Sequence, residues 1–140
     1  MRRFFVLATL FTIGLIVASC SASSANIKSA QLAKGFQDGK VIDAATTFSP
    51  SDTPIHCVVQ VANAPEGTKV KTVWVAVDTT DAAGATYKDQ KIDEKELTVS
   101  DTSSTADFTL INNAAWPTGK YKVDIYLDDN LDRTLEFQVQ

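Results

Sequence analysis

The strongest constraint on the fold is a two-residue alternation of apolar and polar side chains near the C-terminal end of the chain. In "TGKYKVDIYLDDNLDRTLEFQV", residues 118–139, apolar residues recur at nearly every second position on both sides of an Asp-Asp-Asn turn. This period places alternate side chains on opposite faces of a β-strand, and the tight turn joins the two halves into a hairpin. From residue 34 onward no stretch shows a sustained 3.6-residue apolar period, so the pattern predicts strands rather than helices.

Similar short runs, rich in Val, Ile, Thr, Tyr and Phe, occur through the rest of the chain and are separated by turn residues. The predicted strands are 27–33, 54–63, 69–78, 87–100, 105–112, 116–129 and 131–139. The first of these is weak and the fourth is mostly polar. About seven short antiparallel strands at this spacing predict an all-β fold, a sandwich of two sheets.

Two aromatic residues refine this expectation. Trp74 lies in the third predicted strand, after a second strand that carries Cys57, and Tyr121 opens the sixth strand after a Pro-x-Gly turn. These positions resemble the core tryptophan and the corner tyrosine of immunoglobulin-like and fibronectin-type sandwiches. The resemblance implies an antiparallel, immunoglobulin-like arrangement. It departs from antibody domains at the disulfide, because Cys57 has no cysteine partner on the sixth strand.

The first 20 residues have the pattern of an export signal. Arg2 and Arg3 precede an uncharged apolar run at residues 4–17. As a helix this run would be roughly 21 Å long, which is short of the roughly 30 Å hydrocarbon layer of a membrane. The run ends in "VASC", an aliphatic residue and two small residues followed by Cys20. This ending resembles the lipobox of bacterial lipoproteins.

The resemblance to bacterial lipoproteins implies a location and an anchor. In that family the cysteine sulfur receives diacylglycerol, a signal peptidase removes the preceding residues, here 1–19, and the new amine is acylated. Cys20 would then hold the chain to a membrane of the bacterial cell envelope, stably because two or more acyl chains are attached. Ser21, directly after the cysteine, resembles the residue found in lipoproteins that are sorted to the outer membrane in hosts with two membranes. The alternative is an ordinary secretory signal in which Cys20 has no special role.

Small polar residues dominate 20–30 and predict a tether between the lipid and a sandwich domain at 31–140. Loss of Arg2 and Arg3 with the signal peptide leaves 11 Lys and Arg against 17 Asp and Glu, a net charge of −6. This acidic balance argues against nucleic acid as a partner, since phosphates require a basic surface. It also adds no attraction to anionic lipid beyond the anchor.

The sequence contains no recognised catalytic or cofactor motif and no Cys/His cluster, so we expect no enzyme activity, cofactor or metal. His56 is interpreted as a surface histidine. Cys57 is interpreted as a buried, inert thiol rather than a reactive one.

One acidic turn has a spacing that also occurs in calcium loops. Asp128, Asn130 and Asp132 follow the 1, 3, 5 order of oxygen ligands, but Arg133 and Val139 stand where a helical calcium hand needs Gly and Glu. A hairpin turn explains the three residues without a metal.

The third predicted strand carries an unusual outer face. If Trp74 faces the core, Val73, Val75 and Val77 face outward with no charge among them, where a half-exposed antiparallel sheet is usually polar. Together with Tyr126 they form a candidate partner face. Two alternatives stay open: another segment covers these valines, or the inside and outside of this strand are exchanged.

These features predict a lipid-anchored, non-catalytic binding module of the envelope that holds a protein partner. An alternative is a membrane-anchored inhibitor of a hydrolase, a protease or a lysozyme, which inserts the loop at 63–68 or 112–119 into an active site. Trp116 would be the loop contact, unless it caps the end of the sandwich. A carbohydrate-binding domain is a third alternative, with Tyr87, Trp116 and Tyr126 as its candidate aromatic residues.

Overall fold

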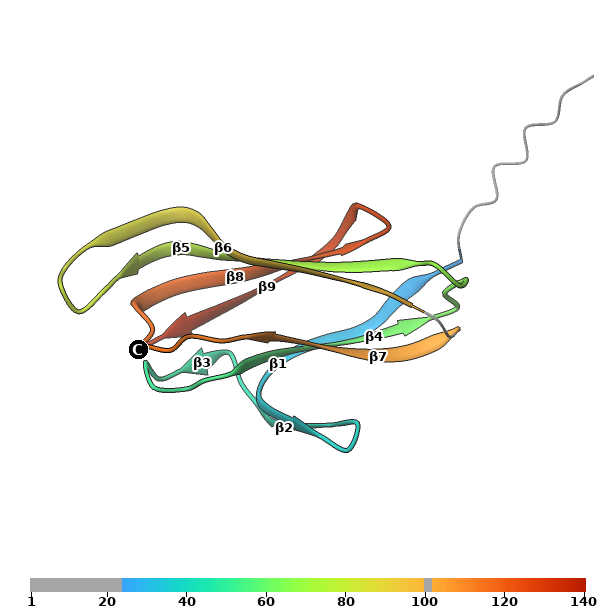
Figure 1. Ribbon diagram of the computed structural model, residues 1–140, viewed down its shortest axis with the longest axis horizontal. Coiled ribbons are helices and arrows are strands. Elements are labelled where there is room, and N and C mark those ends of the chain that lie inside the picture. The colour runs from blue at the N-terminus through green and yellow to red at the C-terminus, as the bar shows by residue number, and fades with distance from the viewer. Residues whose placement is uncertain (1–23, 100–101) are drawn as a thin grey trace, which may run out of the picture.

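The computed structural model describes residues 24–99 and 102–140 as two β-sheets packed face to face (Figure 1). The strands are β1 (Asn26–Gln37), β2 (Lys40–Ala44), β3 (Thr47–Phe48), β4 (Ile55–Ala62), β5 (Lys69–Thr80), β6 (Thr86–Thr98), β7 (Ser103–Leu110), β8 (Thr118–Leu127) and β9 (Asn130–Val139). The predicted all-β sandwich is confirmed, with nine strands instead of about seven. Within the described ranges, no helix is long and apolar enough to cross a membrane. The predicted signal peptide and Cys20 lie outside the described residues.

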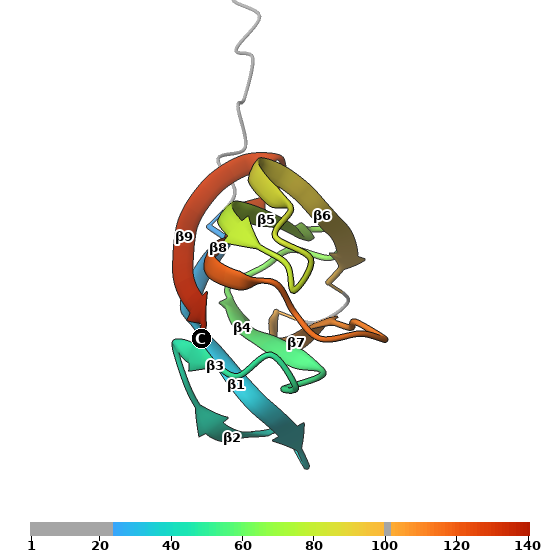
Figure 2. The ribbon, with the colours of Figure 1, turned by 90° about the vertical axis from the view of Figure 1, so that its left-hand side faces the viewer.

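The two sheets divide the strands by position rather than by order in the chain. One sheet has the order β2-β1-β4-β7 and the other β3-β9-β8-β5-β6. Neighbouring strands are antiparallel except β3, which pairs in parallel with the last two residues of β9. Figure 2 shows β9 and β6 at opposite sides of the five-stranded sheet, with β1, β4 and β7 below. The chain therefore crosses from one sheet to the other after β2, β3, β4, β6 and β7.

Aromatic rings occupy the centre of the core, and two of them, Trp74 and Tyr121, lie where the sequence predicts core positions. Trp74 is fully buried, and its ring meets Phe137 edge-on with the centroids 6.0 Å apart. Tyr121 stacks on the Phe137 ring with the centroids 5.1 Å apart, and Phe48 of β3 meets the same ring edge-on at 5.7 Å. Pairs of this kind stabilise a core by about 0.5–1.5 kcal/mol beyond the burial of their area.

The corner predicted for Tyr121 is formed. Its hydroxyl donates a 2.6 Å hydrogen bond to the carbonyl of Pro117, four residues earlier, which fixes the chain as it enters β8. Burial raises the pKa of the Tyr121 hydroxyl to about 12, so it remains a donor at any physiological pH.

Two basic side chains bridge the sheets where their edges face each other. The Arg133 guanidinium of β9 donates a 2.7 Å hydrogen bond to the carbonyl of Ile27 in β1. At the opposite edge, the Lys95 ammonium of β6 donates to the carbonyl of Thr109 in β7. Each bond satisfies a backbone acceptor that faces the open edge. Hydrogen bonds to charged groups are among the stronger ones in proteins.

The N-terminal boundary and two details differ from the sequence expectations. β1 begins at Asn26, so residues 26–30 of the predicted tether belong to the sheet, because backbone pairing with β4 does not depend on their small side chains. β2 was not expected, since its side chains are largely exposed and carry no alternation. The alternation in residues 131–139 predicts that Leu131 faces inward with Arg133. An extra residue in β9, Asp132, shifts the register opposite Ile125 and Tyr126 of β8, and Leu131 is 55% exposed.

We predict that Tyr121→Phe lowers the free energy of unfolding by about 1 kcal/mol, because it removes the hydrogen bond to Pro117 but keeps the stacked ring. Chemical denaturation followed by tryptophan fluorescence measures the change.

Thr72→Val is the matched control for the loss of a buried hydroxyl. The Thr72 hydroxyl is buried and has no hydrogen-bond partner in the described part of the chain. Its replacement by a methyl group is expected to leave the stability unchanged or to raise it by about 1 kcal/mol. Equal losses in both variants would contradict the role of the corner.

Candidate functional site

The predicted partner face lies on the outer side of the five-stranded sheet, along its strand β5. Val73, Val75 and Val77 are half-buried there, whereas Trp74 and Ala76 between them are buried. The predicted inside and outside of this strand are therefore correct, and the exchanged orientation is excluded. The three valines are shielded in part by their neighbours and do not form a bare apolar surface.

Charged residues on the adjacent strands flank the valines in two rows. The cross-strand neighbours are acidic beside Val73 and basic beside Val75: Glu94 and Asp124, then Lys91 and Lys122. Along each flanking strand the base and the acid form an ion pair, at 3.1 Å on β6 and 3.0 Å on β8. Within each flanking strand the acid and the base thus neutralise each other, and the valine row between the two strands carries no charge.

Contacts fix the β8 flank more firmly than the β6 flank. The Asp124 carboxylate also accepts a 2.6 Å hydrogen bond from the Thr134 hydroxyl, and Asp124 is buried. Its hydrogen bond to Lys122 raises the pKa of that ammonium. The corresponding pair on β6 lies on an edge strand and is more exposed.

Tyr126 lies on the same outer face, beside the end of the valine row. It is the cross-strand neighbour of Lys71, whose ammonium is 4.9 Å from the centroid of the Tyr126 ring and 3.7 Å from the Asp129 carboxylate. The ring is half-buried under this cation. Tyr126 therefore borders the face as a cation–π partner of Lys71.

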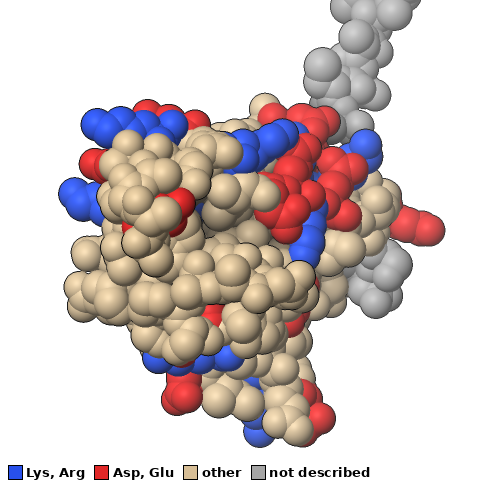
Figure 3. Space-filling model, turned by 60° about the vertical axis from the view of Figure 1, so that its left-hand side comes forward, with Lys and Arg blue, Asp and Glu red and all other residues tan. Residues whose placement is uncertain are grey.

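The distribution of charge separates this sheet from the end of the sandwich. Figure 3 shows charged side chains of both signs along the upper side of the molecule, over the five-stranded sheet, and again at the β2 hairpin below. Between them lies a band with almost no charge, at the end that carries the C-terminus. Two of the loops at this end, residues 49–54 and 111–117, contain one charged residue, Asp52, which pairs with Lys34 at 2.9 Å.

Trp116 caps this end of the sandwich and does not project from its loop. Only 7% of its surface is exposed, and its indole N–H donates a 2.7 Å hydrogen bond to the carbonyl of Asp52. The Trp116 ring also meets Tyr121 edge-on at 6.5 Å. Of the two alternatives for this residue, the structure favours the cap over the loop contact.

The structure corrects the interpretation of His56. This side chain is buried, and its Nδ1 lies 2.9 Å from a carboxylate oxygen of Asp107 on the adjacent strand β7. No local pattern indicates the pairing, because 51 residues separate the two side chains. The Asp107 carboxylate holds the imidazole between two neighbouring strands, so we assign the pair a structural role on the outer face of the four-stranded sheet.

Residues 128–130 form the predicted hairpin turn. Asp128 and Asp129 adopt the left-handed conformation that such turns require, at φ of 47° and 65°. An oxygen of the Asp128 carboxylate accepts a 2.9 Å hydrogen bond from the backbone N–H of Lys69. In residues 24–99 and 102–140, no group of three or more His, Cys, Asp or Glu side chains is placed to hold a metal ion.

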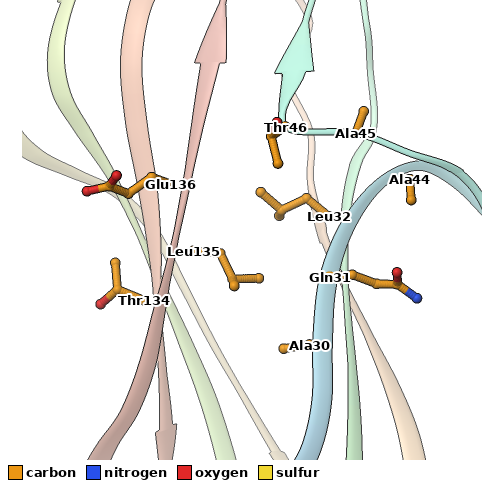
Figure 4. Close-up of a pocket in the computed structure, with 9 residues that line it drawn as sticks. All are labelled: Ala30, Gln31, Leu32, Ala44, Ala45, Thr46, Thr134, Leu135 and Glu136. Carbon is orange, nitrogen blue, oxygen red and sulfur yellow. The ribbon is translucent and has the colours of Figure 1, made fainter.

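A groove runs between the two sheets at the edge where β1 faces β9 (Figure 4). Its volume is about 550 Å³. Leu32 and Leu135 point toward each other across it, with Ala30 beside them and Thr46 closing one end. Sequence reasoning missed this groove, because it follows from how little of β9 the two-residue strand β3 covers.

A smaller hollow of about 260 Å³ lies at the opposite edge, between β6 and the loop after β7. Ile92 and Ile111 line it and are 39% and 63% exposed. Tyr87 also lines it, with its hydroxyl donating a 3.0 Å hydrogen bond to Asp81. Tyr87 and Tyr126 therefore lie at separate places and do not form one aromatic surface for a sugar.

No protein-family model and no curated protein matches the sequence. Solved structures with partial similarity to this chain include the alkylpurine DNA glycosylase AlkC of Pseudomonas fluorescens, at 12% identity and a TM-score of 0.47 over 84% of this chain and 31% of that one. A β-D-glucoside glucohydrolase of Trichoderma reesei matches at 12% identity and 0.47, over 84% and 19%. A β-glucosidase of Listeria innocua matches at 11% identity and 0.45, over 83% and 16%. This chain spans less than a third of each, and no function is drawn from these similarities.

Cys57 is a buried thiol, as predicted. It is fully buried in the core, and burial raises its pKa to about 12, with a further contribution from the nearby Asp107 carboxylate. Because an unfolded cysteine has a pKa of about 8.5, only the unfolded state loses the proton between these values. The stabilising contribution of the neutral thiol is therefore complete below about pH 8.5 and is lost as the pH rises toward 12.

We predict that Cys57 does not react with iodoacetamide at pH 8 in the native chain and reacts fully in denaturant. Mass spectrometry of the peptide that contains Cys57 measures both states. Fast modification of the native protein would show that this part of the core opens or that the thiolate is stabilised.

Proposed function

We propose that this chain is a lipid-anchored, non-catalytic binding module of the bacterial cell envelope, held at Cys20 and binding a protein partner through the outer face of β5. The observation that carries the proposal is the uncharged row Val73, Val75 and Val77, with self-neutralised ion pairs on both sides. In hosts with two membranes, Ser21 supports the outer membrane as the location.

The anatomy of this face suits a protein partner. Interfaces between proteins combine an apolar centre with a polar rim, and rim charges contribute mainly to specificity. Here the centre is half-buried valine and the rim presents an acidic row beside a basic row. A complementary surface would need an apolar patch with the two signs in the opposite order. Exposed pairs such as Lys91 and Glu94 contribute little stability, so they can exchange partners at small cost.

The other two functions have less support. A hydrolase inhibitor with Trp116 as its wedge would have to extract a buried indole from its hydrogen bond with Asp52. A sugar-binding face would need neighbouring exposed aromatic rings. Tyr126 lies apart from the other two candidates, and although Tyr87 and Trp116 line the same hollow, Trp116 is buried. We therefore retain protein binding as the proposed function.

The anchor is tested by Cys20→Ser. We predict that this variant loses incorporation of radiolabelled palmitate and moves from the membrane fraction, since a single cysteine carries the lipid in this class of protein. Labelling and fractionation of cells that express the full chain measure both properties. Retention of the label by the variant would contradict lipidation at this residue.

The docking face is tested by the double variant Val73→Lys, Val75→Glu. Each new charge lies between two residues of the opposite sign, so the fold is expected to be retained within about 1 kcal/mol. In cells, crosslinking of the full chain to its envelope partner is predicted to fall at least about tenfold, because a charge is buried at the centre of the contact.

Ile42→Lys, Ile111→Lys is the matched control, because both side chains are exposed and apolar and lie outside this face. It is expected to leave the crosslinked species unchanged. The same crosslinked species in equal amount with the Val73→Lys, Val75→Glu chain would refute the docking face.

A further inference from the structure

We propose that the groove between β1 and β9 is a second binding site, which takes an extended peptide segment of a partner protein as an added strand on the edge of β9. The peptide would have apolar side chains at alternate positions and basic side chains between them. This site is separate from the valine face of β5 and does not depend on its function.

The direction of the backbone groups on β9 points to a peptide. The N–H of Gln138 donates to the carbonyl of Thr46, and the N–H of Gln140 donates to that of Phe48. The backbone N–H and C=O groups of the even-numbered residues at this end of β9 therefore point away from β8. The two-residue period of a strand therefore turns the N–H and C=O of Thr134 and Glu136 into the groove. None of these groups has a backbone partner in the described part of the chain.

The opposite wall of the groove offers similar backbone groups, at Ala30 of β1. The carbonyl of Leu32 faces away from β4, since it accepts a hydrogen bond from the N–H of Ala45. By the same period, the N–H and C=O of Ala30 face the groove as well. Among ligands, an extended peptide backbone presents donors and acceptors at the matching spacing, which is how β-strand addition gives affinity.

The apolar floor sets the side chains of one face of the peptide. Leu32 and Leu135 point into the gap from the two sheets, and the volume of about 550 Å³ falls within the range of about 300–1,000 Å³ for ligand pockets. Alternate side chains of an added strand would cover these two leucines. Thr46 limits the groove at one end, and the hydrogen bond from Arg133 to Ile27 spans the gap between β9 and β1.

Charge sets the other face of the peptide. Glu136 points to the outer side of β9, is exposed and forms no ion pair within the described residues. Its cross-strand neighbour Lys122 is already paired with Asp124. A basic side chain on the outer face of an added strand would lie beside the Glu136 carboxylate, and the net charge of the chain favours a basic ligand.

The two edges of the five-stranded sheet differ in how they are protected. Seven of the 13 residues of β6 are charged, which is a common protection of an exposed edge against strand addition. Residues 134–138 of β9 carry one charge. The edge that borders the groove thus lacks the protection that the other edge has, as expected of an edge that receives a strand.

The test uses the full chain, purified in non-ionic detergent, and a fluorescein-labelled peptide of the sequence Lys-Val-Lys-Val-Lys-Val-Lys. Fluorescence anisotropy is expected to show saturable binding. Glu136→Gln removes only the charge and is expected to weaken binding about two- to fivefold. Glu136→Pro also removes the N–H that faces the groove, without removing a donor to β8, and is expected to weaken it about tenfold or more. A peptide with Pro in place of the central Val is expected not to bind.

Two groups of results would overturn the proposal. Absent saturation, or equal binding of the proline peptide, would show that the groove does not accept a strand and that any attraction is only of charge. Sedimentation of the chain as a dimer that Glu136→Pro dissociates would make a second copy the occupant. Circular dichroism verifies the fold of each variant, and if Glu136→Pro does not fold, the two peptides and Glu136→Gln still decide the outcome.

Discussion

The hydrogen bond from Arg133 to the carbonyl of Ile27 holds together an edge that the strands themselves leave open. β1 pairs with β4 in one sheet. Beside β9 in the other sheet, the chain forms only the two-residue strand β3. Most of the β9 edge therefore has no neighbour, and a cation from one sheet reaches a carbonyl of the other. Lys95 does the same at the opposite edge, with Thr109. The groove between β1 and β9 is a direct consequence of this arrangement.

The strict alternation that builds the core also explains the valine face. Burial of Trp74 and Ala76 on one side of β5 forces Val73, Val75 and Val77 to the other. The neighbouring strands then cover part of the valines with ion-paired side chains, so that the face is uncharged at its centre and charged at its rim. An apolar strand can thus remain at a surface without the broad exposed patch that promotes aggregation.

The strands with clear alternation and local turns could be predicted from the sequence, as could the inward position of Trp74 and the corner at Tyr121, because each depends on neighbours within a few residues. The contact between His56 and Asp107 and the burial of Trp116 against Asp52 could not be predicted, since both depend on which distant segments become adjacent. The bulge that turns Leu131 outward and the short strand β3 are likewise set by the pairing of whole strands. The groove depends on that pairing, so the sequence pattern alone does not reveal it.

Amide hydrogen exchange along β9 in the full chain, without added peptide, tests the open edge most directly. The structure predicts rapid exchange at Thr134 and Glu136, whose N–H groups face the groove, and slow exchange at Leu135 and Phe137, which pair with β8. Gln138 should also exchange slowly, because its N–H donates to the carbonyl of Thr46. Slow exchange at all five residues would contradict an open edge and show that the groove is already filled in the native protein.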